Sequence, residues 1–261
     1  MEQRLEPYVE WFESYVQSFM HGTEEDVKYI ALKHDHTLRV LENATLITNS
    51  LSLDEEQRYV ALLGALFHDV GRFVQYETYR TFSDKNSVNH GLLGSRILKR
   101  EKVLGCEPLH IQHSVRVAVA LHNRLLIPAH LPQHFHAPLH IVRDSDKLDI
   151  FPVLVSNFTR DGSANDVVRM GVEDVPDAYS QKMVDDLLAG RLLKYSDMRY
   201  VNDFKLLLAS WVFALQYTKS VELMHERGVM EDLLATLPEI SPMEKVRDAV
   251  RAEIERVLQG A

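Results

Sequence analysis

Apolar residues recur along most of the chain with the three- and four-residue spacing of an α-helix, and no convincing strand-like alternation interrupts them. Residues 24–48 form the first clear segment, and Thr23 followed by acidic residues predicts its N-cap and first turn. Asp54 is the expected cap of the next helix, whose apolar body is 59–67. Further helices are expected over 87–102, 110–123, 139–152, 200–227 and 242–258. The pattern predicts an all-α fold.

Prolines and glycines mark the expected interruptions of this pattern. Pro128, Pro132 and Pro138 indicate an irregular connector, and Pro152 is expected to end the helix that begins at 139. Residues 159–177 are predicted to form a loop with short extended pieces around 167–172. Internal repeats and low-complexity tracts are absent from the sequence. We therefore expect a single domain over 1–261, with a core at about 24–155 and a C-terminal helical extension at about 178–261.

Composition and charge narrow the classes of protein. The 261 residues are 46% hydrophobic, which is enough for a sizeable core. The net charge of −9 disfavours a DNA-binding protein, although local basic groups can still hold a small phosphorylated ligand. Cys106 is the single cysteine, which excludes an internal disulfide and a cysteine-rich zinc site. With no membrane-length apolar run and no signal-like start, we expect a cytoplasmic protein.

The strongest candidate for chemistry is the pair His68-Asp69, in the apolar segment Ala65-Leu-Phe-His-Asp-Val-Gly-Arg72. Burying an imidazole and a carboxylate without partners is costly, and a metal ion would satisfy both. Other metal-ligand candidates lie in separate predicted helices: His36, His90, His122 and Asp146. Facing helices of a bundle can project such side chains into one interior site, and this ligand chemistry suits transition metals better than calcium. A lone histidine on an apolar helix is more often a core residue, so spacing alone leaves both interpretations open.

These residues resemble the H…HD…D signature of the HD-domain superfamily of metal-dependent phosphohydrolases. His36, followed by an Arg-Val pair, matches the first histidine, and His34 is its competitor. The doublet is followed by the usual glycine, Gly71. Asp146, directly before Lys-Leu, matches the last aspartate; Asp144 competes, but two residues rotate a helix by about 200°. The resemblance implies a helical bundle with additional C-terminal helices.

The likeness extends to a subgroup of compact bacterial HD proteins that carry HDIGRF, SVDHA, NHN and IRDADKLDI. The matching segments are 81–84, 86–91, 122–123, 141–150 and 211–213. The resemblance therefore covers about 30–215. The chain departs from the pattern at Asn89, Leu121 and Ser145, none of them a predicted ligand, and the change at Asn89 is expected to weaken an outer contact of the site.

The resemblance implies a divalent metal ion, with Mn, Fe, Co, Ni, Zn and Mg as candidates, at one or two ions per chain. His36, His68, Asp69 and Asp146 would hold one ion and leave positions open for water and substrate. His90 and His122 match the extra histidines of two-metal members, in which case Asp69 would bridge the ions. The alternative is that both histidines bind substrate phosphate.

Residues around the predicted metal site supply the expected catalytic and substrate contacts. Asp69 is expected to orient the attacking water, and Arg72, one turn after His68, to contact phosphate. An ordinary salt bridge at the helix end is the alternative for Arg72. Asn123, Arg143 and Lys147 are further substrate-binding candidates. For the two basic residues, pairing with Asp144 or Asp149 is the alternative.

The predicted function is hydrolysis of a phosphate ester of a small molecule, most simply a nucleotide. Residues 123–128 stand where cyclic-dinucleotide enzymes carry a Gly-Tyr-Pro motif, which disfavours that specialisation. Two alternatives remain: a diiron oxygenase of the HD type, and a noncatalytic nucleotide-binding sensor, which the complete ligand set disfavours. Residues 178–261 carry no chemical motif, and their apolar stripes predict either core packing or a homo-oligomer interface.

Overall fold

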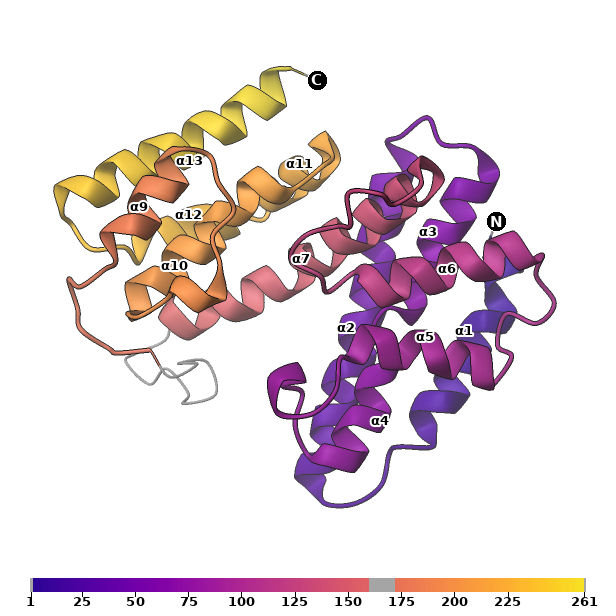
Figure 1. Cartoon of the computed structure of the whole chain (residues 1–261). Coiled ribbons are helices and arrows are strands. Elements are labelled where there is room, and N and C mark those ends of the chain that lie inside the picture. Colours follow the sequence, from indigo (N-terminus) through magenta and orange to yellow (C-terminus); the bar gives the residue numbers. More distant parts are fainter. Residues whose placement is uncertain (1, 160–171, 261) are drawn as a thin grey trace. The chain divides into compact units, whose positions relative to one another are not determined.

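The computed structural model describes residues 2–159 and 172–260, and its regular elements there are all helical (Figure 1). The prediction of an all-α fold is confirmed. An isolated bridge between Glu173 and Tyr200 is the extended pairing seen in the described part of the chain. The loop predicted over 159–177 lies largely outside the described residues. The chain divides into two compact units, up to Asp149 and from Ile150 onward, and each is described by itself. The single domain over 1–261 stays a prediction.

The first unit is a bundle of helices that surround a continuous apolar core. Its helices are α1 (Glu2–Gln17), α2 (Glu24–Asn49), α3 (Glu55–Phe67), α4 (Val70–Tyr79), α5 (His90–Arg100), α6 (Leu109–Leu121) and the first part of α7 (His136–Thr159). Helix α3 contacts α2 and α6, and α5 contacts both α4 and α6 (Figure 1). Tyr59, Phe67 and Phe73 are fully buried among these helices.

Predicted caps fix the starts of α2 and α3. The Thr23 hydroxyl accepts from the Asp26 amide at 3.1 Å, and the Asp26 carboxylate accepts from the Thr23 amide at 3.0 Å. Asp54 likewise accepts from the Gln57 amide at 2.7 Å. Both caps are therefore confirmed, since each satisfies an amide that has no partner within its helix.

Helix α5 is shorter than expected, because Asn89 caps it. The Asn89 side chain accepts from the Leu92 amide at 2.8 Å, so the helix begins at His90 instead of 87. Asn89 therefore has a structural role at the helix start.

Helix α7 contradicts the expected break at Pro152, since it continues through this residue to Thr159. A proline removes one intrahelical hydrogen bond but does not end a helix whose neighbouring side chains are well packed. Phe151 and Val155 on either side of it are buried. Their burial offsets the lost bond. The boundary between the two units also falls within α7.

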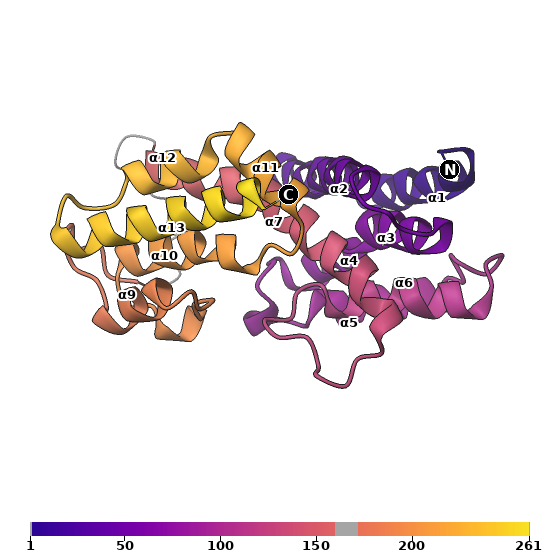
Figure 2. The same ribbon diagram turned by 90° about the horizontal axis from the view of Figure 1, so that it is seen from above.

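The second unit is a set of shorter helices. They are α9 (Gln181–Leu188), α10 (Val201–Ala209), the 3₁₀ helix η4 (Ser210–Ala214), α11 (Thr218–Glu226), α12 (Val229–Ala235) and α13 (Ser241–Gln259). Helix α13, predicted at 242–258, packs along α9 and α11 in both ribbon views (Figures 1 and 2).

The continuous helix predicted over 200–227 is wrong, since the segment divides into α10, η4 and α11. The division occurs at a serine that competes for backbone groups. The buried Ser210 hydroxyl donates to the Leu207 carbonyl at 2.7 Å and accepts from the Leu193 amide at 3.2 Å. Five residues later the backbone at Leu215 is extended.

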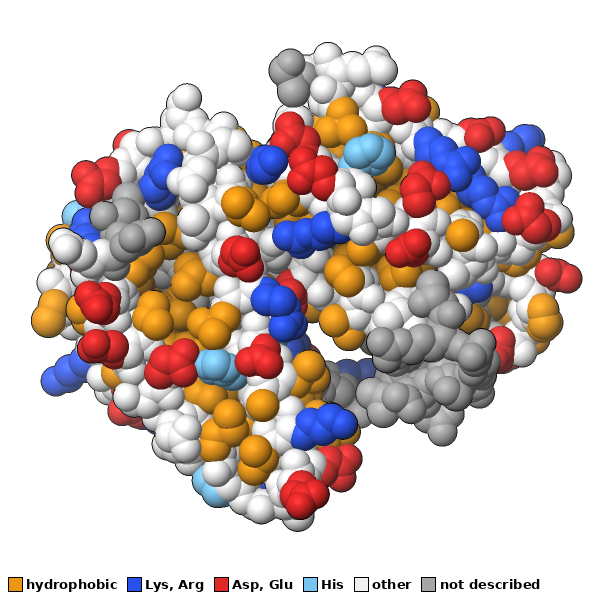
Figure 3. Space-filling view, turned by 180° about the vertical axis from the view of Figure 1, so that it is seen from behind, with side chains coloured by type: hydrophobic (Ala, Val, Ile, Leu, Met, Phe, Trp, Pro, Cys, Tyr) orange, Lys and Arg blue, Asp and Glu red, His pale blue; other side chains and the backbone are white. Residues whose placement is uncertain are grey.

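None of the described helices is long and apolar enough to cross a membrane. On the described part of the face drawn in Figure 3, acidic and basic side chains are interspersed. Cys106 is exposed and unpaired with another cysteine.

Candidate metal centre

The His68-Asp69 doublet lies at the corner where α3 ends and α4 begins. Both side chains are buried. Gly71, two residues later, allows α4 to approach α5 closely, because a Cβ there would lie 2.2 Å from the His90 carbonyl oxygen. The corner and the close approach together bring Asp69 next to His90.

A first group of ligand atoms surrounds one oxygen of Asp69. The Nε2 atom of His36 lies 3.1 Å from His68 Nε2, 3.5 Å from Asp69 Oδ2 and 3.3 Å from Asp146 Oδ1. His68 Nε2 lies 3.8 Å from each of these two carboxylate oxygens. The structure therefore brings together the predicted ligands of a first ion.

A second group surrounds the other oxygen of the same carboxylate. His90 Nε2 lies 3.0 Å from His122 Nε2 and 3.3 Å from Asp69 Oδ1, and His122 Nε2 lies 3.9 Å from that oxygen. Asp69 therefore faces each group with one oxygen. Among the described residues, the sets His36, His68, Asp69 and Asp69, His90, His122 have the close spacing that a metal ion requires. Asp146 adjoins the first set through its distances to His36 and His68.

All four histidines use Nδ1 to donate a hydrogen bond away from the centre. The acceptors are Asp149 Oδ2 for His36 (2.7 Å), the Ala65 carbonyl for His68 (2.7 Å), Asp84 Oδ1 for His90 (2.7 Å) and the Val119 carbonyl for His122 (2.8 Å). These oxygens only accept, so the proton lies on Nδ1. Where the ring is neutral, its Nε2 then presents a bare lone pair, and the four Nε2 atoms converge on Asp69.

The electrostatics of this arrangement favour a bound cation. Burial lowers the pKa of His68, and burial together with the neighbouring His90 and His68 lowers the pKa of His122 to about 3. Burial also opposes a charge on His36, but hydrogen bonds to Asp146 and Asp149 raise its pKa. Protonation of one histidine would still leave the Nε2 lone pairs of the other histidines facing one another. Nitrogen and carboxylate donors in this arrangement fit divalent transition metals.

Two carboxylates outside the ligand groups orient the histidines, and the sequence did not single them out for this role. Asp149 also accepts from Arg39, at 2.5 Å and 3.0 Å. Asp84 also accepts from Gln75 at 2.9 Å and from Asn123 at 3.0 Å. Burial raises the pKa of Asp84, but the hydrogen bonds from His90 and Gln75 have the larger opposite effect. The pKa of Asp84 is therefore lowered to about 2. Such partners fix the tautomer and direction of a ligating histidine.

A lysine that the sequence did not single out also contacts the centre. Lys33 lies three residues before His36 on α2, and its Nζ donates to Asp69 Oδ2 at 2.8 Å. The helical spacing of three residues before the first histidine was the signal available in the sequence. A cation is therefore in contact with the carboxylate that faces both ligand groups.

Arg72 contacts the centre but is already bound on several sides. Its guanidinium donates to Asp69 Oδ1 at 3.3 Å, Asp84 Oδ1 at 3.1 Å and Gln75 Oε1 at 2.9 Å, and also to the Phe82 carbonyl. The salt bridge considered as the alternative is therefore present. A catalytic contact with phosphate stays a prediction.

The other predicted substrate contacts lie at different places. Arg143 donates to backbone carbonyls after α6, among them His122 at 2.9 Å. Lys147 Nζ lies 3.4 Å from the Arg143 carbonyl, and burial lowers its pKa to about 8. Asn123 donates to Asp84, and its buried Oδ1 has no hydrogen-bond partner among the described residues. A substrate contact by Asn123 stays a prediction.

The competing residues lie outside the two ligand groups. His34 Nε2 pairs with Glu13 at 2.9 Å, and its Nδ1 pairs with Asp35. Asp144 is fully buried but belongs to neither group. The geometry therefore favours His36 over His34 and Asp146 over Asp144.

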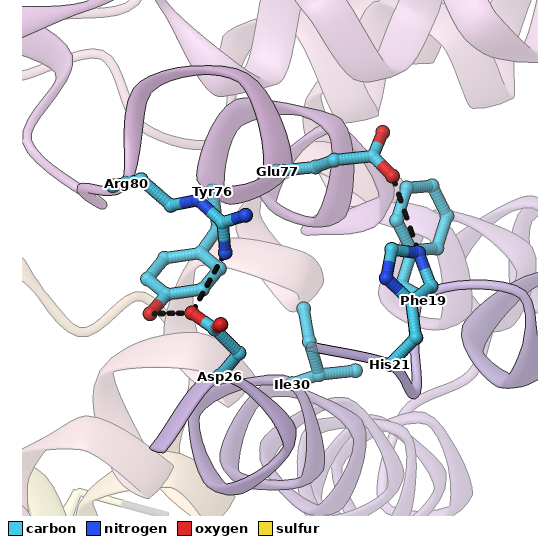
Figure 4. A pocket seen from close by; sticks show the side chains of 7 residues that line it. All are labelled: Phe19, His21, Asp26, Ile30, Tyr76, Glu77 and Arg80. Carbon is cyan, nitrogen blue, oxygen red and sulfur yellow. Dashed lines mark hydrogen bonds and ion pairs between the residues drawn. The ribbon is translucent and has the colours of Figure 1, made fainter. Parts of the chain in front are cut away.

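A hollow formed by the end of α1, the start of α2 and the end of α4 is separate from this centre (Figure 4). Tyr76 and Arg80 both donate to Asp26 Oδ1, at 2.9 Å and 2.7 Å. On the opposite side, His21 Nε2 lies 3.4 Å from Glu77. These pairs join the helices across the hollow, which indicates a structural role.

Comparison with known proteins identifies the region that holds the centre. Residues 34–150 match the family model described as HD domain. All six predicted metal ligands lie within the matched range. No curated protein and no solved structure gave a match.

Proposed function

Because residues 34–150 match the HD-domain model, and that superfamily consists mostly of metal-dependent phosphohydrolases, we propose that the chain hydrolyses a phosphate ester of a small molecule, most simply a nucleotide. The observation that carries this proposal is the convergence of four Nε2 lone pairs on the two oxygens of Asp69. A centre of this kind has no ordinary structural purpose, because it places buried acceptors against one another.

We further propose two ions per chain. His36, His68, Asp146 and one Asp69 oxygen would hold the first, and His90, His122 and the other Asp69 oxygen the second. The alternative role of the second pair, direct binding of phosphate, is less favoured, since His122 is buried with a pKa lowered to about 3 and cannot supply positive charge.

Bound divalent ions would supply water activated near neutral pH and would neutralise phosphate charge. The chain's own residues then position the metal ligands. Asp69 fixes the distance between the two ligand groups, and Arg72 secures the Asp69 carboxylate from α4. The expected partner is a small phosphorylated substrate. Cytoplasmic location and self-association stay predictions.

A substrate screen tests the activity. We expect p-nitrophenyl phosphates or nucleotides to be hydrolysed with Mn²⁺, Co²⁺, Ni²⁺ or Mg²⁺, and Asp69→Ala to abolish turnover. Activity that survives Asp69→Ala would overturn the assignment of the centre. Oxygen consumption that requires iron, without hydrolysis under any of these metals, would favour the diiron oxygenase. A nucleotide that raises thermal stability without turnover would favour a sensor.

Metal analysis tests the number of ions. Wild type is expected to hold two ions per chain, and His90→Ala or His122→Ala about one. His110→Ala is the matched control, since His110 lies on α6 with His122 but is exposed. If neither variant holds less metal than this control, the two-ion proposal fails.

A further inference from the structure

We infer that Lys33 is the residue that binds the phosphate group of the substrate, an inference that rests on the proposed function. The sequence suggested Arg72, Arg143 and Lys147 for contacts of this kind. The structure assigns the contact to a fourth cation.

Lys33 is placed directly beside the ligand atoms. It precedes His36 by one turn of α2, and its Nζ lies 2.8 Å from Asp69 Oδ2, the oxygen that faces the first ligand group. Its side chain is 16% exposed, and Nζ lies 5.5 Å from the centroid of the Phe82 ring. The side chain is therefore largely removed from bulk water without being fully buried.

The neighbouring arginines are each held by at least two hydrogen bonds to protein acceptors. Arg39 makes two hydrogen bonds to Asp149. Arg72 is bound by Asp69, Gln75, Asp84 and a backbone carbonyl. Arg143 is bound by the carbonyls after α6. Moving any of them to a ligand would break contacts that hold the helices or orient the ligating histidines.

The two lysines differ in what they contact. Lys147 reaches the carbonyl of Arg143, and within the described parts of the chain no ion pair joins it to Asp69 or Asp146. An ammonium group has three N–H donors. For Lys33, the described residues offer one side-chain acceptor, Asp69, so two donors remain for a ligand. Lys33 therefore combines contact with the centre and unused donors.

Charge balance points to an anionic ligand at this position. If divalent ions bind the Asp69 oxygens, the negative charge of Asp69 is shared between the ions and Lys33. The centre would then carry an excess of positive charge. A phosphate group supplies both the negative charge and the acceptor oxygens that a partly buried ammonium requires. Lys33 would then exchange its bond to Asp69 for a phosphate oxygen, without displacement of α2.

Binding of inorganic phosphate to Mn²⁺-loaded protein, measured by calorimetry, tests this inference. We expect Lys33→Met to bind phosphate about ten- to a hundredfold more weakly, which corresponds to loss of one charge-assisted hydrogen bond. Manganese content is expected to stay unchanged. Lys33→Arg, which keeps the charge, is expected to lose less affinity. Lys28→Met, an exposed position on the same helix, is the matched control and is expected to behave as wild type.

The outcomes separate this inference from the proposed function. Phosphate affinity in Lys33→Met equal to that of the Lys28→Met control would overturn it. Loss of manganese in Lys33→Met would also overturn it, because Lys33 would then serve to hold Asp69 in place. Turnover by the wild-type protein tests hydrolysis independently, whereas the ratio of phosphate affinities tests Lys33.

Discussion

At the scale of single residues, the centre depends on where each imidazole places its proton. In each ligand group one histidine donates to a carboxylate and the other to a carbonyl of the preceding helical turn. The carbonyl acceptors lie three residues before their histidines, in the last turn of the same helix. The carboxylate acceptors, Asp149 and Asp84, come from elsewhere in the chain and are therefore open to substitution without loss of a ligand.

The two orienting carboxylates give a pair of predictions, one for each proposed ion. Asp84→Asn is expected to weaken binding of the ion held by His90 about ten- to a hundredfold, because the ring loses its orienting acceptor. Asp149→Asn is expected to weaken the ion held by His36 to a similar degree. Titration of the apoprotein with Mn²⁺ measures both affinities. If both variants weakened the same ion, the assignment of His36 and His90 to two separate ions would be wrong.

The sequence predicted the residues that converge but not the residues that orient them. The ligands follow a motif with characteristic neighbours, so each candidate had at most one close competitor. Asp149 orients a histidine 113 positions earlier in the chain and is one of 38 acidic residues. The contact between Asp149 and His36 depends on the packing of α2 against α7. This packing cannot be read from a single sequence.

At the scale of elements, two helix starts were predicted correctly from their caps, whereas several other helix boundaries were not. Caps at Thr23 and Asp54 are local chemistry, and both were confirmed. At Pro152 and Ser210 the course of the chain depends on tertiary packing. The helix boundaries predicted from local sequence were therefore wrong there. Helix α1 was not predicted, although Leu5, Tyr8, Phe12 and Val16 are buried at helical spacing. That signal was available in the sequence, and Pro7 within the segment obscured it.

Asp26 couples α2 to α4 and gives a pH-dependent prediction. Hydrogen bonds from Thr23 and Tyr76 lower its pKa from 3.8 to about 2. Its contribution to stability is therefore fully present above about pH 4 and is lost as the pH falls toward 2. Asp26→Asn is expected to lower the melting temperature at pH 7, and the difference from wild type should shrink between pH 4 and pH 2.

Glu24→Gln provides the control for this measurement. Glu24 is an exposed acid in the same first turn, so it reports the effect of helix-end charge without the contacts to α4. An Asp26→Asn difference that is constant from pH 7 to pH 2, or one equalled by Glu24→Gln, would contradict the role given to Asp26.

At the scale of the whole molecule, the chemistry belongs to one unit. All six predicted ligands, both orienting carboxylates and Lys33 lie at or before Asp149, the last residue of the first unit. The second unit carries α9 to α13 and none of these residues. The sequence anticipated this division of roles, since it placed every chemical motif ahead of residue 155.

Removal of metal is therefore expected to act on the first unit. Each ion at a hundredfold excess over its dissociation constant stabilises a fold by about 2.7 kcal/mol, so two ions together contribute about 5 kcal/mol, which corresponds to a melting shift of about 10–20 °C for a chain of this size. We expect EDTA to lower the melting temperature by about this amount and to increase hydrogen exchange in the helices that carry ligands. Asp69→Ala should remove the response to EDTA. An equal EDTA shift in that variant would place the stabilising ions elsewhere.

The order of the ligands along the chain has a consequence for biosynthesis. The residues of the second ligand group lie between Asp69 and His122, nested within the span from His36 to Asp146 that closes the first. A growing chain therefore completes the inner set while the outer one still lacks its final carboxylate. The ribosome must release the first half of α7 before His36 gains both Asp146 and Asp149. If the chain binds the proposed ions, the outer ion can be captured only late in synthesis, when the unit that carries the ligands is complete.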